Sequence, residues 1–206
     1  MGVTRAYAAT RNLVENISPQ LLISFGIAGT VETDLEIGDV VLSEACCRLN
    51  NEIFGAIISL ELWLEAAREA VAKILSSRGR RQYIGTAVTT GGVQIDQSQL
   101  GGMQHPVLEM ETAGIAAVAA VFSIPLLSIR AISDGPRAPI PSGLGEVMDE
   151  NANLKTGKLI KEIIHHPKIT LQSRRMIQNR RRAADYAALT LIASLGEVTP
   201  EQTKIE

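Results

Sequence analysis

The sequence predicts an α/β protein with a largely parallel sheet, because short apolar runs of strand length alternate with segments of helical spacing. The 206 residues are 46% hydrophobic and carry a formal net charge of −2. This composition is ordinary for a globular protein and excludes a disordered or collagen-like chain. The length suits one core without disulfides or a structural metal, so we expect a single domain over residues 1–206.

The first half of the chain predicts a short helix followed by two strands. Residues 5–15 favour the helix, which should end before Pro19. Residues 20–25 are an apolar run typical of a buried strand, and the glycines that bound residues 26–29 predict a tight turn after it. Residues 38–43 predict the next strand.

The second half continues the alternation. Residues 59–77 form the clearest amphipathic helix, with apolar residues at helical spacing. Residues 83–89 predict a strand, residues 111–122 a helix of small residues, and residues 125–132 a strand that leads into Asp134.

Nothing in the sequence predicts a membrane span or a secretory leader. The longest uncharged stretch, residues 112–129, is divided by Pro125 into a helix and a strand. Residues 1–18 have no continuous apolar core of the kind a signal peptide needs. Cys46 and Cys47 are adjacent and cannot form a routine structural disulfide with each other, which fits a reducing compartment. We expect a cytoplasmic protein.

Positive charge is concentrated near the C-terminus. Residues 155–182 contain nine Lys or Arg against the single acid Glu162, so this segment carries +8 and the rest of the chain −10. Residues 167–195 predict a long helix, whose arginines form either a solvated face or a surface that attracts anions. Aromatic residues are only 3% of the chain, so if this surface attracts anions, we expect contact with the inner face of an anionic membrane rather than with nucleic acid.

Three segments are candidates for a ligand site, because parallel α/β sheets bind ligands at the carboxyl ends of their strands. They are residues 26–29, the Glu-Met-Glu run that ends at Glu111, and the strand end from Arg130 to Asp134. Each has an ordinary structural explanation when taken alone. A glutamate at a helix start complements the helix dipole, and an aspartate after a strand commonly caps a turn.

Taken together and in this order, the segments resemble the purine and uridine phosphorylase superfamily, which includes methylthioadenosine/S-adenosylhomocysteine nucleosidases. The resemblance rests on Gly26-x-Ala-Gly29, on Leu35-x-x-Gly38-Asp-Val-Val41, on Glu109-Met-Glu-x-Ala-Gly-Ile115 and on Ile129-Arg-x-Ile-Ser-Asp134. It implies a three-layer α/β/α fold with a twisted, mostly parallel sheet of the nucleoside phosphorylase type. It also implies a homo-oligomer that cleaves the N-glycosidic bond of a purine nucleoside.

The resemblance also implies the site residues. Asp134 matches the general acid that protonates the leaving purine, and Glu111 matches the carboxylate that binds the ribose hydroxyls. Met110 matches the residue that packs on the sugar. The remaining substrate-binding positions that we expect are Gly26, Ile27, Ala28, Gly29, Val93, Gln94 and Arg130.

We expect no metal and no cofactor, with inorganic phosphate as a candidate co-substrate. His105, His165 and His166 have no carboxylate or cysteine partner at metal-ligand spacing in the sequence. Whether water or phosphate accepts the sugar stays open, because Ile27 stands where relatives usually carry Ser or Thr. Residues 1–6 resemble the family's entry into a helix that normally follows a strand-and-hairpin portion, so we expect the chain to be N-terminally shortened relative to the family.

Beyond Asp134 the chain is similar to the hopanoid-associated phosphorylases. The similarity lies in Pro139-x-Pro, in residues 147–154 and in the basic tail with Ile163-Ile-x-His-Pro167. It implies release of adenine from adenosylhopane during hopanoid biosynthesis. Val93, in the place of an aromatic residue that stacks on the base, would leave room for a bulky apolar substituent. Two alternatives remain: a methylthioadenosine-type nucleosidase and a non-catalytic remnant that binds a nucleoside.

Overall fold

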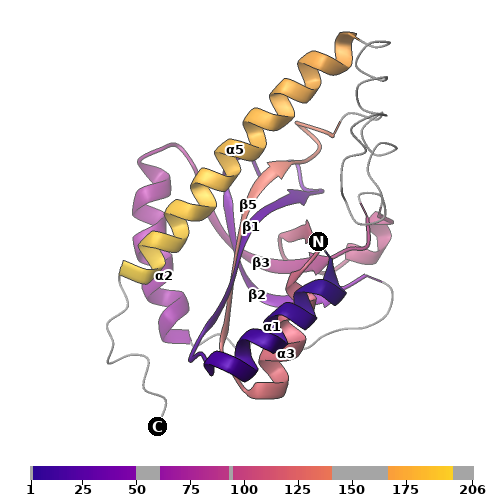
Figure 1. Ribbon diagram of the computed structural model, residues 1–206. Helices are drawn as coiled ribbons and strands as arrows, with labels where there is room; N and C mark the ends of the chain where they lie inside the picture. Colours follow the sequence, from indigo (N-terminus) through magenta and orange to yellow (C-terminus); the bar gives the residue numbers. More distant parts are fainter. Residues whose placement is uncertain (1, 50–60, 93–94, 141–166, 197–206) are drawn as a thin grey trace.

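The computed structural model describes residues 2–49, 61–92, 95–140 and 167–196, and in these ranges helices lie on two sides of a five-stranded barrel (Figure 1). No helix in these ranges is long and apolar enough to cross a membrane. The helices are α1 (Val3–Ile17), α2 (Glu61–Ser76), α3 (Thr112–Phe122) and α5 (Pro167–Gly196), with a 3-10 turn, η1 (Gln97–Leu100). The strands are β1 (Leu22–Thr30), β2 (Val40–Arg48), β3 (Gln82–Thr89), β4 (Pro106–Glu109) and β5 (Leu126–Asp134).

The strands pair in the order β1-β4-β3-β2-β5, and β5 pairs with β1 to close the barrel. The β1–β5, β2–β3 and β3–β4 ladders are parallel, whereas β2–β5 and β1–β4 are antiparallel. The sheet is therefore mixed, and the predicted α/β class is confirmed. The alternation of strands and helices predicts the class but not the closure, because closure depends on pairings between strands far apart in the chain.

Two pairs of helices cover the barrel. On one side α2 and α5 bury apolar residues such as Val71 and Ala187 against Val40 and Ile129. On the other side α1 packs on α3, and α3 packs against β1, β2, β3 and β5. A Cβ on Gly114 would lie 2.4 Å from the carbonyl oxygen of Val3, so α1 and α3 touch where only glycine fits.

Residues 26–29 are not a turn, so that prediction is wrong: β1 runs on through them to Thr30. The ladder with β5 continues to Ala28, and its register shifts at Gly29. The glycines make room for side chains instead. A Cβ on Gly26 would lie 2.8 Å from Nη1 of Arg130, and one on Gly29 would lie 2.6 Å from Oδ2 of Asp134. In sequence, glycines needed for close approach look the same as glycines needed for a turn.

The other predicted elements are found with shifted ends. The strand predicted over residues 38–43 is β2, which begins two residues later and runs on through both cysteines to Arg48. The start predicted for α2 at residue 59 lies outside the described residues. Strand β4 was not predicted, because it has only four residues and begins at Pro106, which cannot donate a backbone hydrogen bond.

Candidate active site

A cavity of about 830 Å³ lies at the carboxyl ends of β1, β3, β4 and β5, within the range of about 300–1,000 Å³ typical of small-molecule sites. Several chain segments line it, so the barrel brings together residues far apart in the sequence. The lining residues are Ile27, Ala28, Gly29, Thr30, Val31, Thr90, Gly92, Ile95, Gln97, Leu108, Glu109, Met110, Glu111, Ser133, Asp134, Gly135, Pro136, Pro139, Ile140 and Arg180.

Asp134 ends β5 and reaches the cavity half-buried. The hydroxyl of Ser133 donates to its Oδ1 over 2.6 Å and lies 3.3 Å from the carbonyl oxygen of Ala28. A hydroxyl has one proton to donate, so Ser133 can serve the carboxylate or the carbonyl but not both. The hydroxyl of Ser133 therefore has two candidate acceptors, Oδ1 of Asp134 and the carbonyl oxygen of Ala28.

Glu111 occupies the N-cap position of α3 and is also half-buried. Its Oε1 accepts a hydrogen bond from the backbone N–H of Gly2 over 3.2 Å. Its own backbone N–H donates to Oε2 of Glu109 over 2.8 Å, which fixes the backbone from which the side chain reaches the cavity. The glutamate thus sits where α1, α3 and the end of β4 meet.

Glu109 anchors a buried polar cluster beneath the cavity, which we call the Glu109–Arg130 network (Ser24, Thr89, Glu109, Thr112 and Arg130). Oε2 of Glu109 accepts the backbone N–H groups of Glu111 and Thr112, each over 2.8 Å, and Nη2 of Arg130 over 3.2 Å. Its Oε1 accepts the hydroxyl of Thr89. Nη2 of Arg130 also contacts the hydroxyls of Ser24 and Thr112 at 2.6 and 2.7 Å. The network pairs two buried charges and caps α3 at the same time, while Nε of Arg130 is buried without a partner among the described residues.

The structure places the expected site residues in three groups. Those that line the cavity are Ile27, Ala28, Gly29, Met110, Glu111 and Asp134. Gly26 and Arg130 are not among the lining residues, since Gly26 leaves room for the guanidinium of Arg130 in the network below. Val93 and Gln94 lie outside the described residues.

The sequence reasoning missed Glu109 and Arg180, which also line the cavity. Glu109 lies two residues before Glu111 in the same motif, and nothing local distinguishes the two carboxylates. Arg180 stands at heptad spacing with Ala183 and Ala187, a signal that could have placed it on the inner side of its helix.

The structure also corrects the prediction that His105 has no carboxylate partner. Nδ1 of His105 lies 2.7 Å from Oε2 of Glu32, and Asp34 lies close by, with the ligand atoms of all three within 4.8 Å of one another. They meet because β1 and β4 are neighbours in the barrel, although His105 and Glu32 are 73 residues apart. This trio could hold a cation, and the absence of a metal stays a prediction.

Cys46 and Cys47 are buried in β2. Burial, with the charge of Glu109 adding to it, raises the pKa of Cys46 to about 12 and raises the pKa of Cys47 as well. The nucleophilic form of cysteine is the thiolate, so burial keeps these thiols in their unreactive form near neutral pH. They act as small packing residues.

Comparison with known proteins finds a match to the family model described as "Phosphorylase superfamily" over residues 1–165. A 5'-methylthioadenosine/S-adenosylhomocysteine nucleosidase from Marinomonas sp. is 24% identical, with 78% of each chain covered. A DeoD-type purine nucleoside phosphorylase from Pasteurella multocida is 29% identical over 65% of this chain and 59% of that protein. The chain therefore spans between about three fifths and four fifths of the length of these relatives.

Among solved structures, a 5'-methylthioadenosine/S-adenosylhomocysteine nucleosidase from Colwellia psychrerythraea in complex with adenine superimposes with a TM-score of 0.67 at 18% identity. The match covers 96% of this chain and 75% of that one. At this identity the superposition establishes the fold, which is the fold that the sequence motifs implied.

Proposed function

The chain belongs to the phosphorylase superfamily, and from this premise we propose that it cleaves the N-glycosidic bond of a purine nucleoside. Its relatives are nucleosidases and a purine nucleoside phosphorylase, so the expected class of enzyme, one that breaks glycosyl bonds, is confirmed at the level of the family. The observation that carries the proposal is the meeting of Asp134 and Glu111 in one cavity. Both are half-buried carboxyl groups, and they reach the cavity from β5 and α3.

Asp134 supplies the proton in the proposed reaction. When the bond between C1′ and the purine nitrogen breaks, its electron pair passes to the base, and a proton from the carboxyl group of Asp134 neutralises that charge at N7. The oxygen of water or phosphate then forms the new bond to C1′, and a water molecule that reacts in this way releases its proton to solvent. Asp134 ends as a carboxylate, and the hydroxyl of Ser133, already 2.6 Å from Oδ1, stabilises that charge.

Glu111 and Met110 hold the sugar. The Glu111 carboxylate accepts hydrogen bonds from ribose hydroxyls and places negative charge near the cationic sugar that forms as the bond breaks. The contact of Glu111 with the N–H of Gly2 takes up one side of one oxygen and leaves the other oxygen for substrate. Met110 offers a flexible, polarisable surface against a ring that changes its pucker.

The substrate that we propose is adenosylhopane or a nucleoside with a similarly bulky apolar substituent. Apolar side chains of Ile27, Val31 and Ile140 contribute to the cavity lining, which supports a substrate with an apolar part. The resemblance of the segment after Asp134 to hopanoid-associated phosphorylases supports the same substrate. A methylthioadenosine-type nucleosidase is the alternative, supported by the Marinomonas and Colwellia proteins.

Contact with an anionic membrane would bring such a substrate to the enzyme. Four arginines on α5 are exposed and lie on one face of the helix: Arg174, Arg175, Arg181 and Arg182. Ile177 is exposed beside them, at 48% of its surface. A cationic face with an apolar residue is suited to a layer of anionic headgroups. Cosedimentation with anionic but not with neutral vesicles would support this contact, and equal recovery with both would contradict it.

The decisive experiment measures adenine release from adenosylhopane and from methylthioadenosine by the purified chain. We expect release by the wild-type protein, with a higher kcat/KM for adenosylhopane, and loss of release in Asp134→Asn. Release that favours methylthioadenosine would leave the bond cleavage standing and overturn the apolar substrate. Tight binding of both nucleosides without any release would overturn the enzyme and favour a nucleoside-binding protein.

A further inference from the structure

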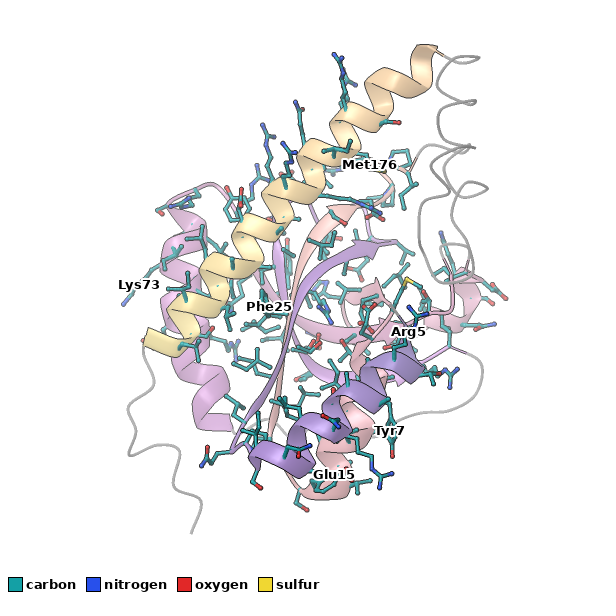
Figure 2. The ribbon with its side chains drawn as sticks, viewed as in Figure 1. Arg5, Tyr7, Glu15, Phe25, Lys73 and Met176 are labelled. Carbon is teal, nitrogen blue, oxygen red and sulfur yellow. The ribbon has the colours of Figure 1, made fainter. Side chains whose placement is uncertain are left out.

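Helix α5 carries a line of inward-facing residues that is small and uncharged except at one position. Ala183, Ala187, Thr190 and Ser194 are all buried and recur at intervals of three and four residues. Arg180 lies on the same side of the helix, three residues before Ala183 and seven residues before Ala187. Met176, one turn earlier on the same side, is half-buried and lies near the strands in Figure 2.

Arg180 therefore differs from the other arginines of α5. It is half-buried and lines the cavity, whereas Arg174, Arg175, Arg181 and Arg182 face outward. Its Nε is buried and has no hydrogen-bond partner among the residues that the structure describes. Asp134 and Glu111 line the same cavity, yet neither forms an ion pair with Arg180 in the part of the chain that the structure describes. The Nε–H of Arg180 thus loses water without gaining an acceptor from the described residues.

We propose that Arg180 is the anion-binding residue of this site and contacts an oxyanion of a reactant. A guanidinium presents parallel N–H donors that match the oxygens of a phosphate or carboxylate. The oxyanion comes either from inorganic phosphate, which would make the reaction a phosphorolysis, or from an acidic group on the nucleoside. Arg180 thus sets which acceptor or which nucleoside the site takes, and this inference rests on the proposed bond cleavage.

The test compares Arg180→Met with Lys73→Met, which removes a cation that projects from α2 into solvent (Figure 2). Adenine release is measured from methylthioadenosine with increasing inorganic phosphate, and from S-adenosylhomocysteine, whose amino-acid portion carries a carboxylate, without phosphate. Calorimetry measures the binding of phosphate and of each nucleoside to the same proteins. Thermal denaturation checks that both variants fold.

If phosphate is the oxyanion, Arg180→Met should raise the KM for phosphate at least tenfold. If the nucleoside carries it, the variant should lose at least tenfold in kcat/KM for S-adenosylhomocysteine relative to methylthioadenosine. Lys73→Met should match the wild type in both arms. A folded Arg180→Met with wild-type phosphate dependence and wild-type preference would overturn the anion site and leave the bond cleavage intact. If no protein releases adenine, the bond cleavage fails, and calorimetry alone decides: weaker anion binding by Arg180→Met supports the site, and equal binding overturns it.

Discussion

Glu109 and Asp134 line the same cavity, but their surroundings differ. Glu109 is 5% exposed and accepts from two backbone N–H groups, from Arg130 and from the hydroxyl of Thr89. Asp134 is half-buried and accepts only from the neighbouring Ser133 among the described residues. A carboxylate whose oxygens are already occupied by protein donors is held in place, whereas one with a single protein donor has an oxygen free to contact a ligand.

The difference separates a structural carboxylate from a reactive one. The Glu109–Arg130 network fixes the start of α3 and thereby the backbone of Glu111, while the cavity above it keeps acceptors free for substrate. Nε of Arg130 and Nε of Arg180 are both buried without a hydrogen-bond partner among the described residues. Nη2 of Arg130, however, contacts three oxygens of the network, whereas Arg180 forms no ion pair with Asp134 or Glu111 in the described part of the chain. Substitutions in the Glu109–Arg130 network should therefore lower stability, whereas substitutions of residues that face the cavity should lower activity.

The largest effect is expected for Asp134→Asn. An amide cannot donate the proton that the leaving base needs, so the rate of adenine release should fall about 10²- to 10⁴-fold with little change in the free energy of unfolding. Single-turnover release of adenine measures the rate. Asp185→Asn, on the exposed part of α5, is the matched control and should retain full activity. A fully active Asp134→Asn would show that another group is the acid.

Glu109→Gln should lower the free energy of unfolding more than it lowers the rate of adenine release. It leaves Arg130 charged and buried without its partner, which should lower the free energy of unfolding by about 3–5 kcal/mol. Urea denaturation followed by circular dichroism measures the loss. Glu15→Gln removes an exposed carboxylate that pairs with Arg11 on α1 and should cost only about 0.3–0.5 kcal/mol, a small shift of the urea midpoint. A midpoint for Glu109→Gln equal to that of the wild type would show that the network is not what holds α3.

The two glycines of β1 should respond differently although they are three residues apart. Gly29→Ala pushes on the carboxylate of Asp134, and a displacement of this kind should slow adenine release about 10- to 100-fold. Gly26→Ala pushes on the buried guanidinium of Arg130 and should cost about 1–3 kcal/mol of stability. Kinetics and urea denaturation are measured on both, with Gly101→Ala as a control, where the added Cβ would make only an ordinary van der Waals contact, 3.6 Å from the carbonyl oxygen of Ser98. Equal loss of stability in both variants would contradict the proposed difference between the Glu109–Arg130 network and the cavity.

The smallest effect concerns Cys46, whose pKa is raised to about 12 by burial and by the charge of Glu109. The thiol of the unfolded chain ionises near pH 9, so the contribution of Cys46 to stability should be complete below pH 9 and decline between pH 9 and 12. The slope should not exceed about 1.4 kcal/mol per pH unit. Urea midpoints of the wild type and Cys46→Ala between pH 8 and 10.5 test this, and parallel curves would contradict it.

Residues with local signals were predictable from the sequence. Apolar runs and helical spacing gave most strands and helices, and the motifs around Glu111 and Asp134 gave residues that the barrel brings to one cavity. The role of Glu109 was not predictable, because it depends on Thr89 and Arg130, each about twenty residues away in the chain. The position of Arg180 in the cavity was not predictable from its place in the basic C-terminal segment, because the net charge of a segment does not show which side of a helix a residue faces.

The short ladder between β1 and β4 has a consequence for local unfolding. Only Gly29 with Leu108 and Thr30 with Val107 join these strands, whereas β1 and β5 share eight register pairs. A ladder this short is where opening of the barrel should cost least, and Gly29, Thr30 and Leu108 also line the cavity. A bound nucleoside would stabilise the closed β1–β4 ladder. Backbone amides in this ladder should therefore exchange with deuterated solvent quickly in the free protein and slowly in the complex.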